Sequence, residues 1–415
     1  MRARPAVALA SLVAALALGG AGCGSGDSGT TTTTDADGGG TRTLTIYSSL
    51  PLQGAARAQS LSIVNAEKLA LAQAGGRVGP FTVKYRSLDD ASEGKWNPAQ
   101  VANNARQAAQ DQSTIVYLGD RDSGASAISI PVLNEAGILQ ISPASTAVGL
   151  TRSEGGDKGE PDKYYPSGKR TFGRVVPADQ IQAAAQLQYQ QDHGCSRLYV
   201  LDDKDVYGVR LARQVEQAAT KSDVMVVGTQ SIDPRAGDYR SLADDVVADS
   251  PDCVFFGGTT QDNAVQLWRD LHAADRQLKL FGGDGVAETA FTSKLSPSEQ
   301  RVTYLTAPTL APDLYPAAGQ RFFREYRREF GQRPEPYAIF GYEAMRLALD
   351  LIKSAPADGD QRQAVVDAFF RVKDRNSVLG RYSIDENGDT TLTDYGAWRI
   401  RHGRLAFDQV LHQRG

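Results

Sequence analysis

The sequence predicts an α/β protein of two doubly wound parallel-sheet lobes joined by a multi-strand hinge. The chain has 415 residues, which is too many for one ordinary core and fits two domains. Apolar strand-like runs alternate with helix-like segments from Leu44 onward, a pattern typical of a parallel sheet covered on both faces. The stretch 151–171, rich in Gly, Lys, Asp and Pro, interrupts the alternation and reads as a long surface connection between two such sets.

The N-terminal region is typical of an exported protein. An apolar run from Ala6 to Leu18 follows a basic start, and small residues lead to Cys23. This pattern predicts an export signal over 1–22, because the run is too short for a permanent membrane span. Small residues before Cys23 resemble a bacterial lipobox, in which the cysteine carries lipid, although Gly20 stands where leucine is usual. Ordinary signal cleavage that leaves an unpaired cysteine is the alternative.

A flexible tether is predicted over 23–42. The segment is dominated by Gly, Ser, Thr and Asp and has no large apolar residue, so it cannot form a core. A lipid anchor with such a tether would keep the folded part near a membrane while leaving it free to move. We therefore expect an extracytoplasmic protein, lipid-anchored to the bacterial cell membrane.

The first set of alternating elements predicts lobe 1. We expect strands at 43–47, 81–85, 114–118 and 138–141, and helices at 55–74, 98–112 and 125–135, two of them ended by Gly75-Gly76 and Gly137. Later helices are expected at 317–330, 338–354 and 361–372. Lobe 1 is thus predicted to consist of 43–171 and 307–377.

The second set predicts lobe 2, consisting of 172–306 and 378–415. We expect a helix at 180–193 and strands near 197–202, 223–228, 253–257, 277–282 and 304–308, with β structure from Gly380 onward. The acidic segment Asp385–Asp389 is predicted to be a turn. It lacks the ligand spacing and the closing glutamate of a calcium loop.

Charge and histidine content narrow the function classes. The net charge is −4, and no basic face or stripe indicates nucleic-acid binding. The four histidines are scattered without metal-ligand spacing, so we expect no metal site and no cofactor. We expect a monomer.

Cys195 and Cys253 each precede a strand-like run. In a doubly wound sheet of order 2-1-3 the first and third strands of the second set are neighbours. Both cysteines would then lie at the same edge of adjacent parallel strands, within bridging distance. Export makes a disulfide between them chemically reasonable, and two buried free thiols are the alternative.

Small hydroxyl residues follow two neighbouring strands of the first set. One loop, 119–126, leads into a helix and contains Ser123; the next, 141–146, contains Ala144, Ser145 and Thr146. Free N–H groups and hydroxyls at two adjacent strand ends can bind a carboxylate without an arginine. Plain helix capping explains either loop alone, but both together favour a binding site.

A loop after a strand of the second set contains an acidic residue that could bind the positive group of a ligand. Asp284 lies between glycines in 282–285, where a lone carboxylate gains little by packing, so it could pair with a ligand ammonium. A simple turn aspartate is the alternative. The spacing of the glycines does not match a dinucleotide-binding loop.

The segments 132–146, 203–208 and 281–285 together resemble the type I periplasmic binding proteins, and within them the leucine/isoleucine/valine-binding family, over nearly the whole chain from Leu44. The resemblance implies the receptor of an ABC importer, with a membrane permease as partner. It also implies site roles: Ser123, Ala144 and Thr146 hold the α-carboxylate and ammonium, Tyr207 closes over the ligand, and Asp284 meets the ammonium.

The predicted ligand is an amino acid, for which the resemblance implies a branched side chain, or a related small amphoteric solute. The segment 257–260, Gly-Gly-Thr-Thr, stands where relatives with aliphatic ligands often have an aromatic residue. Receptors for amides, urea or aromatic acids, and a sensory module of the same fold, are therefore alternatives. An exported hydrolase using Ser123 or Ser145 is disfavoured, because the histidines fall outside the predicted cleft loops and no G-x-S-x-G elbow is present.

Overall fold

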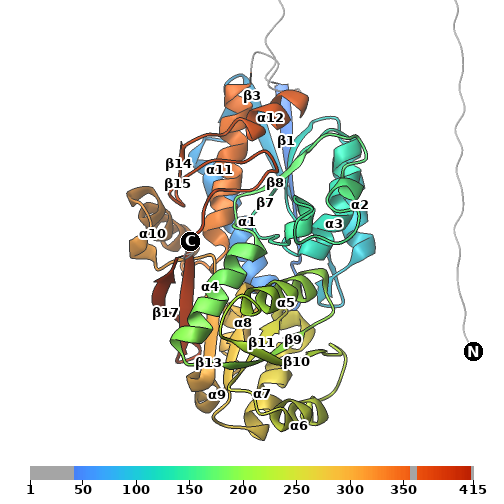
Figure 1. Cartoon of the computed structure of the whole chain (residues 1–415). Coiled ribbons are helices and arrows are strands. Elements are labelled where there is room, and N and C mark those ends of the chain that lie inside the picture. Colours follow the sequence, from blue (N-terminus) through green and yellow to red (C-terminus); the bar gives the residue numbers. More distant parts are fainter. Residues whose placement is uncertain (1–41, 356–361, 413–415) are drawn as a thin grey trace, which may run out of the picture. The chain divides into compact units, whose positions relative to one another are not determined.

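The structure, a computed structural model, describes residues 42–355 and 362–412 (Figure 1). The predicted export signal, the lipidation site Cys23 and all but the last residue of the predicted tether lie outside the described residues. Residues 41–415 separate as one compact unit. No helix within the described ranges has the length and apolarity needed to cross a membrane.

The first sheet has six strands in the order β2-β3-β1-β6-β7-β8. Their bounds are β1 Arg42–Leu50, β2 Arg77–Val78, β3 Phe81–Asp89, β6 Thr114–Gly119, β7 Leu139–Ser142 and β8 Phe172–Arg174. All pairs are parallel except β2 with β3. We call this sheet and its helices lobe 1.

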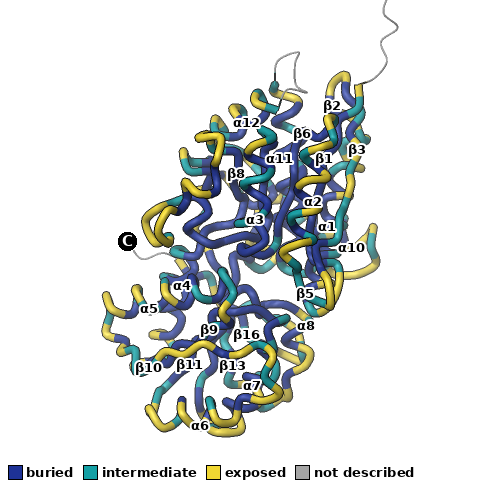
Figure 2. The backbone as a smooth tube through the Cα atoms, turned by 90° about the vertical axis from the view of Figure 1, so that its right-hand side faces the viewer, coloured by how far each residue is buried: buried dark blue, intermediate teal, exposed yellow. Residues whose placement is uncertain are grey.

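Helices cover both faces of the first sheet. The bounds are α1 Arg57–Gln73, α2 Pro98–Gln110, α3 Ser123–Glu135, α10 Ala317–Phe330, α11 Ala338–Ser354 and α12 Arg362–Phe370. Successive residues of β1 point to opposite faces. Ile46 packs in the core of α1 and α11, and Tyr47 packs against α2 and α3. Because helices cover both faces, β6 is buried along its whole length (Figure 2).

The second sheet has seven strands in the order β10-β9-β11-β12-β13-β16-β17. Their bounds are β9 Arg197–Asp202, β10 Met225–Ser231, β11 Cys253–Gly257, β12 Lys279–Gly282, β13 Thr303–Ala307, β16 Tyr395–Arg401 and β17 Arg404–Leu411. The first five are parallel, and β16 and β17 are added antiparallel. We call this sheet and its helices lobe 2.

Helices also cover both faces of the second sheet. The bounds are α4 Asp179–Asp192, α5 Val206–Ala219, α6 Arg240–Ala248, α7 Ala264–Ala274, α8 Thr289–Thr292 and α9 Pro297–Val302. Leu211 of α5 belongs to the core on one face, and Trp268 of α7 belongs to the core on the other. The two doubly wound sheets of the predicted fold class are therefore present. The remaining short strands pair as β4 (Ala91–Ser92) with β5 (Lys95–Trp96) and β14 (Arg375–Asn376) with β15 (Arg381–Tyr382).

The chain passes between the lobes three times, and two of these passages differ from the boundaries expected from sequence. Phe172–Arg174 was expected in lobe 2 but forms β8, paired with β7 in lobe 1. Tyr382 and Ile384, also expected in lobe 2, are buried in the lobe 1 core. A strand of three residues shows no period of its own, and hydrophobic patterning does not say which of two cores a residue enters.

Cys195 and Cys253 are brought together by the sheet order. Cys253 begins β11, Cys195 lies just before β9, and these two strands are adjacent and parallel. The Cα atoms of the two cysteines are 5.8 Å apart, a separation typical of disulfide-linked residues.

Glu67 of α1 is a fully buried acid. The Tyr85 hydroxyl donates a hydrogen bond to one carboxylate oxygen, and the other oxygen has no hydrogen-bond partner. Burial raises the pKa of Glu67 from 4.5 to about 8, although the bond from Tyr85 opposes the rise. Between pH 4.5 and about pH 8 the folded protein keeps the proton on Glu67, whereas the unfolded chain has lost it. The free energy of unfolding therefore falls as the pH rises through this interval.

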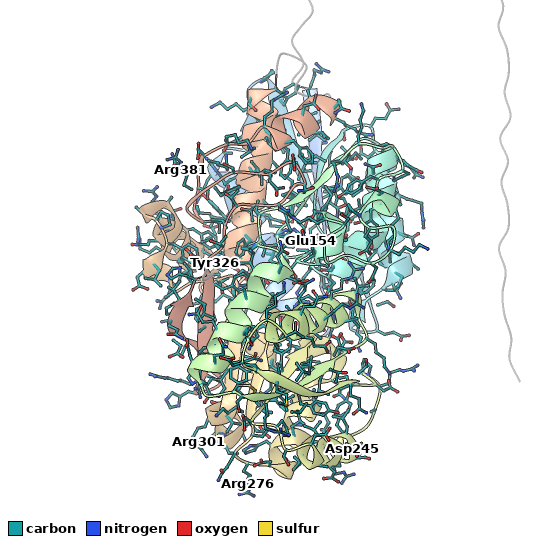
Figure 3. All side chains as sticks on the ribbon, in the orientation of Figure 1. Glu154, Asp245, Arg276, Arg301, Tyr326 and Arg381 are labelled. Carbon is teal, nitrogen blue, oxygen red and sulfur yellow. A yellow bond between two sulfur atoms is a disulfide. The ribbon has the colours of Figure 1, made fainter. Side chains whose placement is uncertain are left out.

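We expect Glu67→Gln to lessen the loss of stability between about pH 5 and about pH 8, because glutamine has no proton to lose. Urea denaturation at the two pH values measures the change in the free energy of unfolding. The surface variant Glu154→Gln (Figure 3) should keep the wild-type pH dependence. An unchanged pH dependence in Glu67→Gln would show that Glu67 ionises alike in both states.

Candidate functional site

A cavity lies between the lobes at the carboxyl ends of the parallel strands. It has room for a volume of about 20 Å³ and is partly open to solvent. Lobe 1 contributes Arg121, Asp122, Ser123, Ala144 and Tyr337 to its walls, and lobe 2 contributes Tyr207, Thr259, Asp284 and Gly285. The structure thus brings four of the predicted site residues, Ser123, Ala144, Tyr207 and Asp284, to one cavity.

The start of α3 forms part of the lobe 1 wall. Asp122 has the extended conformation of an N-cap residue, but its side chain makes no capping hydrogen bond to the first turn. The Ser123 hydroxyl accepts a hydrogen bond from the N–H of Ala147 at 3.2 Å and keeps its own proton to donate. Uncapped N–H groups and the positive end of the helix dipole attract a carboxylate.

The loop after β7 is held by Ser142. Its hydroxyl accepts hydrogen bonds from the N–H groups of Ala144 and Ser145, at 3.1 and 2.8 Å. Ala144 lines the cavity, whereas the Ser145 hydroxyl is bonded inside lobe 1 to Ser126 at 2.8 Å and to the carbonyl oxygen of Asp120 at 3.0 Å. Ser145 therefore supports the loop from behind and is not one of the cavity-lining residues.

Thr146 lies one residue further on and also does not line the cavity. Its carbonyl oxygen accepts a hydrogen bond from the N–H of Asp179 at 2.9 Å, and its buried hydroxyl has no hydrogen-bond partner. Asp179, the first residue of α4, is fully buried with both carboxylate oxygens unpartnered. Burial and then the negative charge of Asp284 raise the pKa of Asp179 to about 7. Sequence reasoning did not single out Asp179.

Asp284 is the most tightly surrounded acid of the cavity. The hydroxyl of Tyr207, on the first turn of α5, donates to one of its carboxylate oxygens at 2.7 Å. The hydroxyl of Tyr337, which comes from lobe 1, donates to the other. Burial raises the pKa of Asp284, and the two tyrosine hydrogen bonds oppose that rise by stabilising the carboxylate. Asp284 is thus an oriented, buried anion that a ligand ammonium can neutralise.

Arg121 is a cavity residue that sequence reasoning missed. Its guanidinium forms ion pairs with Asp122 at 3.2 Å and with Glu288 of lobe 2 at 3.4 Å. The only sequence signal was its position after β6, where a side chain can point either into the cavity or away from it. Tyr337 was missed for the same reason, since it belongs to no pattern that distinguishes cavity from core. Thr259 belongs to the segment 257–260, which the family resemblance had singled out.

The hairpin of β4 and β5 reaches from lobe 1 to lobe 2. Lys95 forms an ion pair with Asp262 at 2.8 Å, and the Trp96 indole N–H donates to Asp205 at 3.3 Å. We call these two interactions the hairpin contact. They join the lobes beside the cavity without any cavity residue taking part.

The segment 151–171, expected as a surface connection, also joins the lobes. Its Glu160 is buried and pairs with Arg210 of α5 at 2.5 Å, and its Asp157 pairs with Arg210 and Arg213 at 3.1 and 2.8 Å. Tyr164 is buried beside it. We call these ion pairs the connection contact. The polar composition of the segment therefore reflects an interface between the lobes as well as exposure.

Metal binding finds no support in the part of the chain that the structure describes. No group of three or more histidine, cysteine or acidic side chains there could hold a metal ion.

Comparison with known proteins identifies one family. The family model described as periplasmic binding protein matches residues 43–403. The Leu/Ile/Val-binding protein BraC3 of Rhizobium johnstonii is 24% identical over 367 residues, covering 87% of this chain and 93% of that protein. An amino acid binding protein of Pseudomonas aeruginosa is 24% identical over 326 residues, covering 78% of this chain and 80% of that protein.

Solved structures agree in fold at lower sequence identity. The leucine-binding protein LivK of Thermotoga maritima has a TM-score of 0.77 at 20% identity and covers 89% of this chain and 99% of that one. LivJ of Streptococcus pneumoniae in complex with isoleucine has a TM-score of 0.74 at 17% identity, covering 89% and 100%. A solute-binding protein of R. palustris in complex with benzoate has a TM-score of 0.75 at 18% identity, covering 89% and 96%.

Proposed function

This chain belongs to the type I periplasmic binding proteins, the extracytoplasmic binding components of ABC transporters, and on that premise we propose that it binds an amino acid or a related small amphoteric solute for import. The matched relatives are binding proteins and not enzymes. In the proposal the solute lies in the cavity, the lobes close over it, and a membrane permease recognises the closed form. The binding component acts as a monomer without a cofactor.

One arrangement carries the proposal. Asp284, oriented by Tyr207 and Tyr337, lies in the same cavity as the uncapped start of α3. A buried carboxylate suits an α-ammonium, and helix N–H groups with the Ser123 hydroxyl suit an α-carboxylate. Ser145 and Thr146 belong to the loop that holds Ala144 in the wall.

The known relatives do not determine which side chain the ligand carries. Structures of nearly equal likeness are in complex with isoleucine and with benzoate. The α-amino acid group is therefore the part of the ligand that the cavity residues support. Because one neighbour binds benzoate, the alternative class of ligand is a carboxylate without an amine.

Thermal unfolding of the ligand-free chain from residue 41 tests the proposal. The panel should hold α-amino acids, amides, urea and small carboxylates that have no amine. A solute that binds only the folded state raises the unfolding midpoint by mass action, with about 2.7 kcal/mol of stabilisation at 100 times its dissociation constant. We expect a rise with at least one α-amino acid. A rise only with amine-free carboxylates would refute the role of Asp284 and favour an aromatic-acid receptor.

We propose further that Cys195 and Cys253 form a disulfide, as their separation and an oxidising compartment allow. We expect the double substitution Cys195→Ser, Cys253→Ser to lower the free energy of unfolding by about 2–4 kcal/mol, since the crosslink restricts the unfolded chain. A reductant should destabilise the wild-type protein and not the double variant. Alkylation of both thiols in denatured, unreduced protein would contradict the bond.

We propose that Cys23 carries the lipid anchor. Cys23→Ser should move the protein from the membrane fraction to the soluble fraction, because the anchor is its only covalent lipid in this proposal. Mass analysis of the wild-type N-terminus should find acyl chains on Cys23. An unmodified, membrane-free wild-type protein would refute the anchor and leave the solute-binding proposal untouched.

A further inference from the structure

Arg121, Asp122 and Glu288, which we call the Arg121 cluster, form a buried set of charges at the cavity. Their side chains are 9%, 5% and 2% exposed. One guanidinium faces two carboxylates, so the cluster holds one negative charge in excess when both acids are ionised. Water, which would otherwise offset that excess, has almost no access to these side chains.

Two carboxylate oxygens of the cluster lack a hydrogen bond. Arg121 and Gln261 both donate to the same oxygen of Asp122, and its other oxygen is buried without a partner. Glu288 likewise uses one oxygen for Arg121 and has the other buried and unpartnered. An unpaired buried acceptor loses its hydration without compensation. Asp122 lines the cavity, so a bound solute can reach it.

The surroundings of Asp122 disfavour its charged form. Burial raises the pKa of Asp122 to about 6; Arg121 opposes this, and the charges of Asp262 and Glu288 add to it. Lys95 neutralises Asp262 through the hairpin contact, but it adds no charge to the Arg121 cluster. The cavity thus favours additional positive charge near Asp122.

The residues that line the cavity include no large aliphatic side chain. Thr259 lines it where a larger apolar residue could have stood, and its hydroxyl is bonded to Asp262 at 2.6 Å. Tyr207 and Tyr337 direct their hydroxyls to Asp284. Ala144 is the one aliphatic side chain among the lining residues.

We propose that the solute is an α-amino acid with a cationic side chain, an ammonium or a guanidinium, that binds at Asp122 beside Glu288. This inference rests on the proposed amino-acid function of the same cavity. The charges of the ligand and the cavity then balance. The α-ammonium of the ligand pairs with Asp284, and its α-carboxylate binds at the start of α3. Arg121 neutralises one acid of its cluster, and the cationic side chain of the ligand neutralises the other. An apolar side chain would leave two buried carboxylate oxygens unpaired.

Isosteric ligand pairs test the inference by calorimetric titration of the ligand-free chain from residue 41. L-lysine is compared with L-2-aminoheptanoic acid, in which a methyl group replaces the ammonium, and L-arginine is compared with L-citrulline. The members of each pair match in shape and differ in charge. We expect at least one cationic member to bind about 100-fold or more tightly than its neutral partner, since a site built for polar partners rejects analogues that lack them. Equal or tighter binding of the neutral partner in both pairs, or of leucine, would overturn the inference and leave the amino-acid function standing. Absence of binding by every amino acid would overturn both.

Three variants separate a direct role from a general loss of charge. Asp122→Asn and Glu288→Gln should each reduce the preference for the cationic ligand at least about tenfold while affecting the neutral ligand less. Asp245 is an exposed residue of α6, away from the cavity (Figure 3). Asp245→Asn removes the same charge as Asp122→Asn and should keep the wild-type preference for the cationic ligand. Should Asp122→Asn fail to fold, Glu288→Gln gives the same test. A preference unchanged in both cavity variants would overturn the assignment.

Discussion

We expect an Asp284→Asn protein to bind its amino acid about 100-fold more weakly than the wild-type protein. Asparagine keeps the shape of the side chain. Its oxygen can accept a hydrogen bond from one of the two tyrosine hydroxyls, and its NH2 group can donate to the other hydroxyl. It lacks the negative charge that would pair with the α-ammonium, and a buried ammonium without a counter-ion is strongly disfavoured. A 100-fold loss corresponds to about 2.7 kcal/mol.

Calorimetric titration with the tightest-binding amino acid measures this loss. Tyr337→Phe is the matched control: it removes one hydrogen bond to Asp284 and retains the charge, so its affinity should fall less than about tenfold. The ligand-free melting temperature should stay close to wild type in both variants. Wild-type affinity in Asp284→Asn would contradict the ammonium role and would make Asp179, a buried acid with two unpartnered carboxylate oxygens, the next candidate for the amine.

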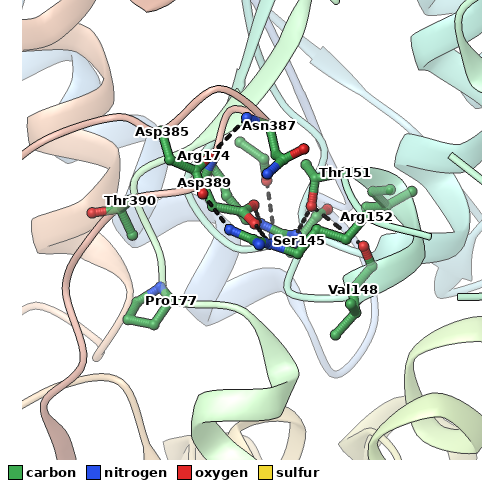
Figure 4. Close-up of polar contacts among 12 residues, drawn as sticks. Ser145, Val148, Thr151, Arg152, Arg174, Pro177, Asp385, Asn387, Asp389 and Thr390 are labelled. Atoms are coloured by element: carbon green, nitrogen blue, oxygen red, sulfur yellow. Dashed lines mark hydrogen bonds and ion pairs between the residues drawn. The ribbon is translucent and has the colours of Figure 1, made fainter. Parts of the chain in front are cut away.

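The second large effect is on stability, and it concerns Arg174. This fully buried guanidinium donates to Asp389 at 2.8 Å and to the carbonyl oxygens of Ser145 and Ala147 at 3.1 and 2.9 Å (Figure 4). It also donates to the Thr151 hydroxyl at 2.6 Å. Arg174 thus fastens the turn at Asp389 to the loop behind Ala144.

We expect Arg174→Met to lower the free energy of unfolding by about 3–5 kcal/mol, because it removes a buried donor from one oxygen of Asp389 and from the carbonyl oxygens of Ser145 and Ala147. Arg152→Met is the matched control. Arg152 donates to the other oxygen of Asp389 at 2.7 Å, but it is 36% exposed, so its loss should cost about 1 kcal/mol or less. Urea denaturation of both variants measures the two changes in the free energy of unfolding. Equal effects in the two would mean that burial of Arg174 adds nothing.

Sequence patterning predicted the features that follow from strand order. Alternating elements and the 2-1-3 order placed Cys195 beside Cys253. The rule that ligands bind beyond the carboxyl ends of parallel strands predicted that Ser123 and Asp284 share one site, and both residues line the cavity.

Side-chain direction was not predictable in the same way. Ala144 and Ser145 are consecutive in one loop, yet Ala144 lines the cavity and the Ser145 hydroxyl is bonded inside lobe 1. Arg121 lies in a loop without a recognisable motif, and the direction of its side chain depends on Glu288, a residue distant in sequence. Such directions are set by tertiary contacts, which residue type and spacing do not encode.

The hairpin contact and the connection contact affect the protein even when no solute atom takes part in them. Lys95–Asp262 and Glu160–Arg210 each join a residue of lobe 1 to one of lobe 2, so in the proposed opening and closing they favour the closed state by themselves. The apparent dissociation constant equals the intrinsic one divided by the fraction of binding-competent protein. Salt screens the partly exposed Lys95 pair more than the buried Glu160 pair. The ionic strength around the cell would therefore adjust how readily this receptor takes up its solute, without any change in the residues that touch it.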